Sequence, residues 1–225
     1  MNQPLQAGLA VLLVSLLALL GPGLGISPWW ITLLAALGLG GLSVDAARFG
    51  GRGGHVLAEA LPGGVGRLRR IAIHEAGHLL LAESEELPVQ RVLVGSLACL
   101  EAGVPSGGCT EFLPPDHVRM PLEQLRRWSR VLLAGMAAEQ LIYGDPQGGA
   151  DDRALLGRLW GLSGHPVEVA QREQRRARRE VDQWLRQHRA ALESRAEELL
   201  ASTPRLGHPR RPAAEASAPE PAPAP

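Results

Sequence analysis

The chain has 225 residues, 45% of them hydrophobic, which is enough for one domain of ordinary size with additional segments. Its 23 basic and 23 acidic residues give a formal net charge of zero, which argues against a nucleic-acid partner. The two cysteines, Cys99 and Cys109, are too few for a disulfide framework and lack the close spacing of a thiolate zinc site, so we expect two free thiols.

Two apolar runs open the chain, and no charged side chain precedes Asp45. The first extends from Leu5 to Leu20 and the second from Ile26 to Val44, and Gly21-Pro22-Gly23 separates them. Each run is close to the roughly 20 residues that cross the hydrocarbon core of a bilayer. We therefore predict two transmembrane helices, joined as a hairpin, over residues 1–44, and hence a lipid bilayer as a partner.

A cleaved signal peptide is the alternative interpretation of the first run, but that run lacks a positive n-region and an obvious cleavage site. Basic residues are absent before the second run and frequent after it, which by the positive-inside rule predicts a cytoplasmic C-terminal domain. The basic residues concerned are Arg48, Arg52, Arg67, Arg69 and Arg70. Residues 45–66 are rich in Gly and are predicted to form a flexible linker, whereas the Pro- and Ala-rich residues 203–225 are predicted to be disordered.

The segment His74-Glu75-Ala76-Gly77-His78 has the H-E-x-x-H pattern within a predicted helix from Leu68 to about Glu85. Residues i and i+4 lie on the same face of a helix, so His74 and His78 can present two imidazole nitrogens to one cation. Glu75 is placed beside that pair, where a carboxylate can act as a general base on water. The pattern therefore indicates half of a zinc site, although helices without enzymatic activity also carry it.

The remaining elements are predicted from periodicity and from helix start and stop signals. A strand over Val89–Val94 and a second over Gly107–Phe112 precede a strong helix from Pro121 to Tyr143. A turn then leads into a helix that ends near Trp160, with the pair Asp151 and Asp152 placed to cap it. One long amphipathic helix is predicted from Val167 to Ala201.

Four motifs in this order resemble the peptidase domain of the FtsH family, the membrane-anchored ATP-dependent zinc proteases. They are IHEAGHLLLA, Gly108 to Pro114, Leu133 to Gly144, and Gly149 to Asp152. The resemblance implies a mainly α fold with a small β element over residues 67–202. It also implies a zinc ion held by the two histidines and a downstream Asp, and endopeptidase activity on membrane or unfolded proteins.

The third zinc ligand is less well defined than the first two. We favour Asp152, because Leu156 and Trp160 then follow it at the helical intervals that the family shows after its ligand. Asp151 and Glu139 remain alternatives. The strand over Cys109, Thr110, Glu111 and Phe112 resembles the family's substrate strand, to which an extended peptide could add through backbone hydrogen bonds.

The chain also departs from the family, since no AAA ATPase module lies between the apolar runs and the motif. All its basic residues are Arg, and a Walker A motif needs a Lys to reach the phosphates. We therefore expect a membrane-anchored zinc metalloendopeptidase without its own ATPase, which acts as a homo-oligomer or with a separate ATPase partner. A non-catalytic membrane scaffold is the alternative function. An intramembrane protease is disfavoured, because charged residues closely flank the motif.

Overall fold

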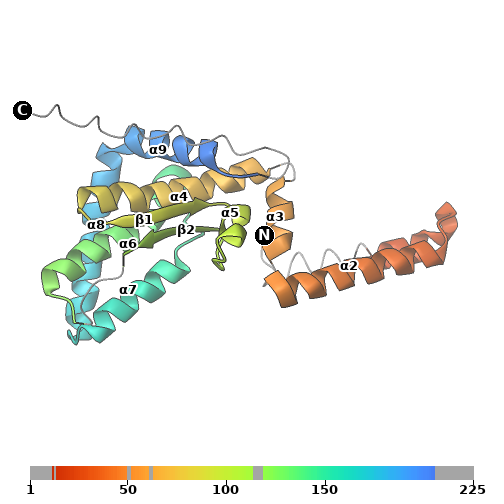
Figure 1. Ribbon diagram of the computed structural model, residues 1–225, viewed down its shortest axis with the longest axis horizontal. Coiled ribbons are helices and arrows are strands. Elements are labelled where there is room, and N and C mark those ends of the chain that lie inside the picture. The colour runs from red at the N-terminus through yellow and green to blue at the C-terminus, as the bar shows by residue number, and fades with distance from the viewer. Residues whose placement is uncertain (1–11, 13, 50–51, 61–62, 114–118, 206–225) are drawn as a thin grey trace, which may run out of the picture. The chain divides into compact units, whose positions relative to one another are not determined.

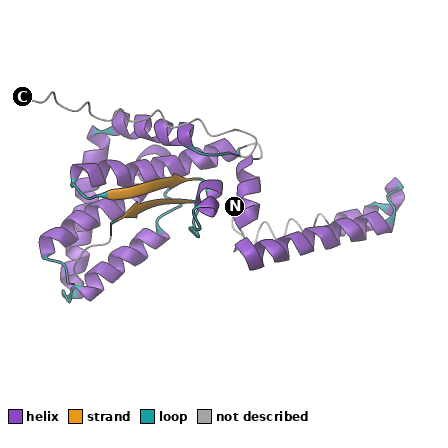
Figure 2. Cartoon of the chain, viewed as in Figure 1, coloured by secondary structure: helices purple, strands orange, loops and turns teal. Residues whose placement is uncertain are grey.

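The computed structural model describes residues 12, 14–49, 52–60, 63–113 and 119–205 (Figure 1). These residues are mostly helical and contain one two-stranded sheet (Figure 2), which confirms the prediction of a mainly α fold with a small β element. The chain divides into two compact units, Met1–Gly54 and His55–Pro225, and each is described by itself.

The first unit contains a short 3-10 helix, η1 (Pro22–Leu24), and the long helix α2 (Pro28–Phe49). Within the described residues, one helical stretch, Pro28–Ala47, is long and apolar enough to cross a membrane. Its side chains are largely exposed, with Trp29 at 82% and Trp30 at 63%. Half of the first apolar run, residues 5–11 and 13, lies outside the described residues, so the two-span hairpin remains a prediction.

The segment predicted as a flexible linker contains a helix, α3 (Arg52–Ala60), and the prediction was wrong for these residues. Val56 is buried, and the Glu59 carboxylate accepts hydrogen bonds from Ser96 N at 3.0 Å and Ser96 Oγ at 2.7 Å. These contacts stabilise a helix that the glycine content disfavours by roughly 1 kcal/mol per Gly. The C-terminal part of α3 therefore belongs to the second unit.

Helix α4 (Gly64–Ser84) is the central element of the second unit and packs against α6 (Leu122–Tyr143), α9 (Arg189–Ser202) and the sheet. The two helices α4 and α6 approach closely at Gly77. A Cβ atom on Gly77 would lie only 2.8 Å from the Ala134 carbonyl oxygen and 2.9 Å from Ala138 Cβ. The small residues at the centre of α6 thus let its backbone lie against the motif helix.

The sheet pairs β1 (Val89–Val94) with β2 (Gly108–Phe112) in antiparallel fashion, which confirms both predicted strands. In this register Val92 lies opposite Thr110, and an irregularity separates Val89 from Arg91. The connection between the strands contains a short helix, α5 (Ser96–Glu101), which was not predicted from the sequence.

The helix predicted from Val167 to Ala201 is divided into α8 (Val167–Gln187) and α9, so the prediction of one continuous helix was wrong. The break is at His188, where φ is −106° and ψ is 24°. The His188 ring stacks on Trp184 with a centroid separation of 3.9 Å, and its Nδ1–H donates to the Trp184 carbonyl oxygen. Of the predicted disordered tail, residues 206–225 lie outside the described residues.

Candidate metal centre

Helix α4 presents His74 and His78 on one face, as the spacing of the motif predicts. Their ring centroids are 4.8 Å apart, and both side chains are buried. Hydrophobic side chains of α4 pack in the core, and this packing directs the two imidazoles inward, between α4 and α6. The core residues concerned are Leu68, Ala72, Ile73, Ala76, Leu80 and Leu81.

The Nδ1 atoms of both histidines are held by acceptors. His74 Nδ1 lies 2.6 Å from Glu139 Oε1, and His78 Nδ1 lies 2.8 Å from the Val131 carbonyl oxygen. A carboxylate and a carbonyl can only accept, so each Nδ1 carries the hydrogen. The two Nε2 atoms are therefore the ones available for a ligand.

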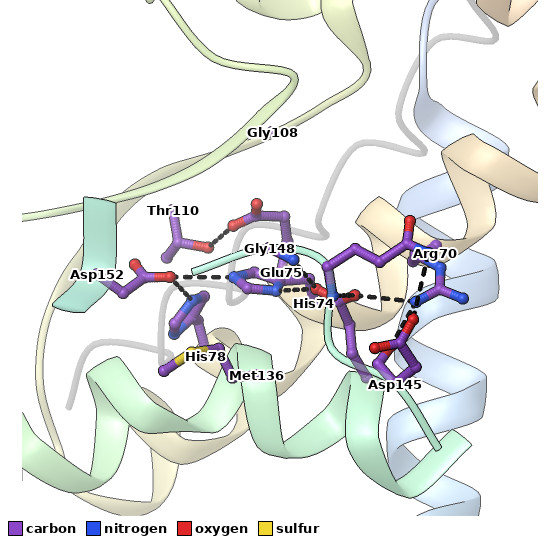
Figure 3. A network of polar contacts seen from close by, with 12 residues as sticks. Arg70, His74, Glu75, His78, Gly108, Thr110, Met136, Asp145, Gly148 and Asp152 are labelled. Atoms are coloured by element: carbon purple, nitrogen blue, oxygen red, sulfur yellow. Dashed lines mark hydrogen bonds and ion pairs between the residues drawn. The ribbon is translucent and has the colours of Figure 1, made fainter. Parts of the chain in front are cut away.

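Asp152 comes from a different element and faces both Nε2 atoms (Figure 3). Its Oδ2 atom lies 3.1 Å from His74 Nε2 and 3.3 Å from His78 Nε2. Asp152 is in the first turn of α7 (Ala150–Leu162), which packs on α6 through the buried side chains of Leu156 and Trp160. Donor atoms of His74, His78 and Asp152 all lie within 4.8 Å of one another, so the three residues form a cluster that could hold a metal ion.

The electrostatics of this cluster favour a positive charge between the carboxylates. Burial lowers the pKa of His74, but hydrogen bonds with Asp152 and Glu139 outweigh burial and raise this pKa to about 10. Burial raises the pKa of Asp152, but the two histidines hold it well below its usual range. The site therefore favours a positive charge at this position, which a bound divalent metal ion would provide.

Two further observations fit a metal ion at this position. His78 Nε2 is buried and meets no hydrogen-bond geometry with the described residues, although Asp152 Oδ2 lies 3.3 Å away. A Cβ atom on Gly135 would lie 2.4 Å from His74 Nε2 and 2.5 Å from His78 Nε2, so only Gly leaves space beside both atoms. Two imidazoles and one carboxylate are also a common ligand set of catalytic zinc, with a fourth position left open.

The two alternative ligands occupy different positions. Asp151 is exposed on α7, and the N-cap of that helix is Gly149, with a φ of 87° and no side-chain cap bond, so the predicted capping by the Asp pair was wrong. Glu139 is buried on α6, on the Nδ1 side of His74. Its Oε2 accepts from Gln147 N at 2.9 Å and Arg70 Nη1 at 3.3 Å, so an arginine balances its charge.

Glu75 is buried beside the histidines and contacts β2. Thr110 Oγ1 donates a hydrogen bond of 2.7 Å to Glu75 Oε2. Burial raises the pKa of Glu75, although both histidines and Thr110 oppose this. Glu75, the residue expected to act as a general base, thus lies next to His74 in the sequence. Its carboxylate also contacts β2, the strand expected to bind substrate.

Not all residues of that strand face the cluster. Thr110 contacts Glu75, and the Phe112 ring lies edge-on to His78 at a centroid distance of 6.4 Å. The Glu111 carboxylate instead pairs with the Arg91 guanidinium of β1. Cys109 lies opposite Leu93, and burial raises the pKa of its thiol to about 11.

Several residues that support the site were not predicted from the sequence. Arg70 and Gly148 contact Glu139, Gly135 contacts both imidazoles, and Val131 holds His78 through its carbonyl oxygen. The small apolar centre of α6 was the only sequence signal for any of them, since a Gly in a helix often marks a close approach.

The cluster thus combines two imidazoles of an H-E-x-x-H segment, a carboxylate that faces both Nε2 atoms, and a second carboxylate next to the pair, an arrangement that could hold a metal ion. No model of a protein family matches the chain. Two curated proteins named ATP-dependent zinc metalloprotease FtsH are similar to part of it. The protein from Ralstonia pickettii is 37% identical over 83 residues, and the one from Methylococcus capsulatus is 34% identical over 86 residues.

The aligned segments cover 36% and 37% of this chain but only 11% and 13% of those two proteins. The similarity therefore links part of the chain to FtsH-type proteases.

Proposed function

We propose that this protein is a membrane-anchored zinc metalloendopeptidase of the FtsH type. The observation that carries the proposal is the convergence of His74, His78 and Asp152, whose donor atoms lie within 4.8 Å of one another in a buried site. The helix Pro28–Ala47, which is apolar enough to span a bilayer, supports the membrane anchor. The partial similarity to two FtsH proteins supports the kind of activity.

His74, His78 and Asp152 would hold zinc through Nε2, Nε2 and a carboxylate oxygen. When bound there, zinc supplies Lewis-acid chemistry, which polarises a peptide carbonyl and lowers the pKa of water. Glu75 is the general base. Thr110 donates a hydrogen bond to its Oε2 atom, and the carboxylate accepts a proton from the attacking water and returns it to the leaving amine nitrogen.

The substrate of this proposal is an extended segment of a membrane or unfolded protein. In the described part of the chain the sheet has two strands, so the edge of β2 away from β1 has no strand partner there. A peptide could add to that edge through backbone hydrogen bonds. We further propose a cytoplasmic site that receives folded substrates through a separate ATPase, or through assembly of several copies.

The experiment that tests the function compares the full chain with its Glu75→Gln variant, using zinc analysis and cleavage of a permanently unfolded protein. An unfolded substrate removes the requirement for an ATPase. We expect wild type to bind zinc and cleave, and Glu75→Gln to keep zinc but lose about 100-fold or more of the cleavage rate. Glu83→Gln is the matched control, because Glu83 lies on the same helix and pairs with Arg195 on the surface.

Cleavage by Glu75→Gln at the wild-type rate would exclude this mechanism. Zinc binding by wild type without any cleavage would favour the non-catalytic scaffold instead.

A further inference from the structure

Strand β2 contacts the motif helix through alternate residues. A Cβ atom on Gly108 would lie 2.4 Å from Ile71 Cγ2 and 2.7 Å from Glu75 Oε1, so the backbone passes directly beside the carboxylate. Thr110 reaches Glu75, and Phe112 lies against His78. Since side chains i, i+2 and i+4 of a strand share one face, this whole face of β2 covers the catalytic segment of α4.

The contact between Thr110 and Glu75 is the polar part of this interface. Glu75 is only 4% exposed, and the Thr110 hydroxyl donates to its Oε2 atom at 2.7 Å (Figure 3). A hydrogen bond to a buried carboxylate stabilises its charged form and fixes its orientation. The hydroxyl therefore restricts the orientation of the Glu75 carboxylate.

The opposite face and the end of β2 are also held in place. The Arg91 guanidinium forms two hydrogen bonds with the Glu111 carboxylate, at 2.6 and 2.9 Å, across the two strands. The Phe112 ring packs edge-on against Trp128 of α6 at 5.4 Å. These contacts fix the two residues that follow Thr110 in the strand. The position of β2 therefore determines the position of Thr110, and through its hydrogen bond the orientation of Glu75.

We infer that Thr110 is a positioning residue for the general base, and that β2 thereby couples peptide binding to the orientation of Glu75. This inference rests on the proposed function, in which Glu75 is the base and the edge of β2 binds the substrate. Pairing of a peptide with that edge fixes the strand, and the Thr110 hydroxyl holds the carboxylate in the orientation that accepts the proton. Thr110 acts on the rate of the chemical step, whereas the backbone of β2 acts on substrate affinity.

The test is steady-state cleavage of an unfolded protein by the full-length, zinc-loaded chain with Thr110→Val or Thr110→Ser. Val has the shape of Thr without the hydroxyl, and Ser keeps the hydroxyl. Loss of a hydrogen bond to a charged group corresponds to about a tenfold or larger fall in rate. We expect kcat to fall by that factor in Thr110→Val with KM within about twofold, because the β2 backbone is unchanged. Thr110→Ser should recover most of kcat.

Thr203→Val is the matched control, because the Thr203 hydroxyl also donates a 2.7 Å hydrogen bond, to the Leu199 carbonyl oxygen at the end of α9. It should keep the wild-type kcat. Zinc content is measured for every variant and should be unchanged in Thr110→Val, because Thr110 is not a ligand, and thermal melting checks that each variant is folded at the assay temperature.

A wild-type kcat in Thr110→Val, a change confined to KM, or failure of Ser to restore kcat would overturn the inference and leave the proposed function standing. Loss of zinc from Thr110→Val would also overturn it, since Thr110 would then support the metal site. Failure of the wild-type chain itself to bind zinc and cleave would overturn the proposed function.

Discussion

Glu139 Oε1 lies 2.6 Å from His74 Nδ1, and this contact joins helix α6 to the metal-ligand face of helix α4. The same carboxylate accepts hydrogen bonds from the backbone N–H groups of Gln147 and Gly148. Those two residues precede α7, which carries Asp152. One buried carboxylate therefore orients a histidine and holds the loop that places the third candidate ligand.

The first prediction concerns this carboxylate. Glu139→Gln should lower zinc affinity by about 10–100-fold, because a histidine ligand whose Nδ1 loses its carboxylate partner is less basic and less well oriented. The measurement is competition with a chromogenic chelator, together with melting of the metal-free chain. Glu173→Gln is the control, since Glu173 is also buried but pairs with Arg126. Equal zinc affinities for the two variants would refute the role of Glu139.

A second prediction distinguishes the two neighbouring aspartates. Asp152→Ala should lose zinc on dialysis, because it removes the oxygen that faces both Nε2 atoms and leaves two imidazoles. Asp151→Ala should keep zinc and change the free energy of unfolding by less than about 1 kcal/mol, since Asp151 is exposed and contributes only through the helix dipole. Metal analysis and thermal melting of both variants provide the check.

The opposite pattern of zinc retention would identify Asp151 as the ligand. If both variants kept zinc, Glu139 would be the remaining carboxylate to test.

Local patterns in the sequence were sufficient to predict that His74 and His78 share one helix face and that Glu75 lies beside them. The i and i+4 spacing places His74 and His78 on one face wherever a helix forms, and alternation predicts both strands for the same local reason. The role of Glu139 was not predictable in this way, because its position 65 residues from His74 becomes relevant only when α4 and α6 pack at Gly77.

Tertiary contacts also explain where the predicted elements differ from the structure. The glycines in residues 45–66 favour an irregular segment, but Glu59 binds Ser96 and Val56 is buried, so α3 forms. No Gly or Pro marks the break at His188, where the His188 ring stacks on Trp184; this difference is local and not tertiary. Thr110 was predicted only as part of a substrate strand, because its contact with Glu75 depends on how β2 lies over α4.

A third prediction concerns membrane topology. A green fluorescent protein fused after Ser202 should fluoresce, and alkaline phosphatase fused there should be inactive, because the arginines that follow the second apolar run predict a cytoplasmic domain. Fusions after Gly25, between the two apolar runs, are the control and should give the reverse result if the runs form a hairpin. Active alkaline phosphatase after Ser202 would contradict the cytoplasmic placement.

The last prediction concerns the space beside the imidazoles. Gly135→Ala adds a methyl group 2.4–2.5 Å from both Nε2 atoms, so the rings must move or the helices α4 and α6 must separate. Overpacking of this kind costs about 1–3 kcal/mol, and each 1.4 kcal/mol of lost zinc-binding free energy lowers the affinity about tenfold. We expect zinc affinity to fall by at least about tenfold, measured by chelator competition, although no ligand has been changed.

Gly157→Ala is the matched control, because a Cβ atom at this position of α7 would have no neighbour within 4 Å. This variant should keep zinc affinity and gain up to about 1 kcal/mol of stability. Wild-type zinc affinity in Gly135→Ala would show that zinc does not bind between the two Nε2 atoms beside α6.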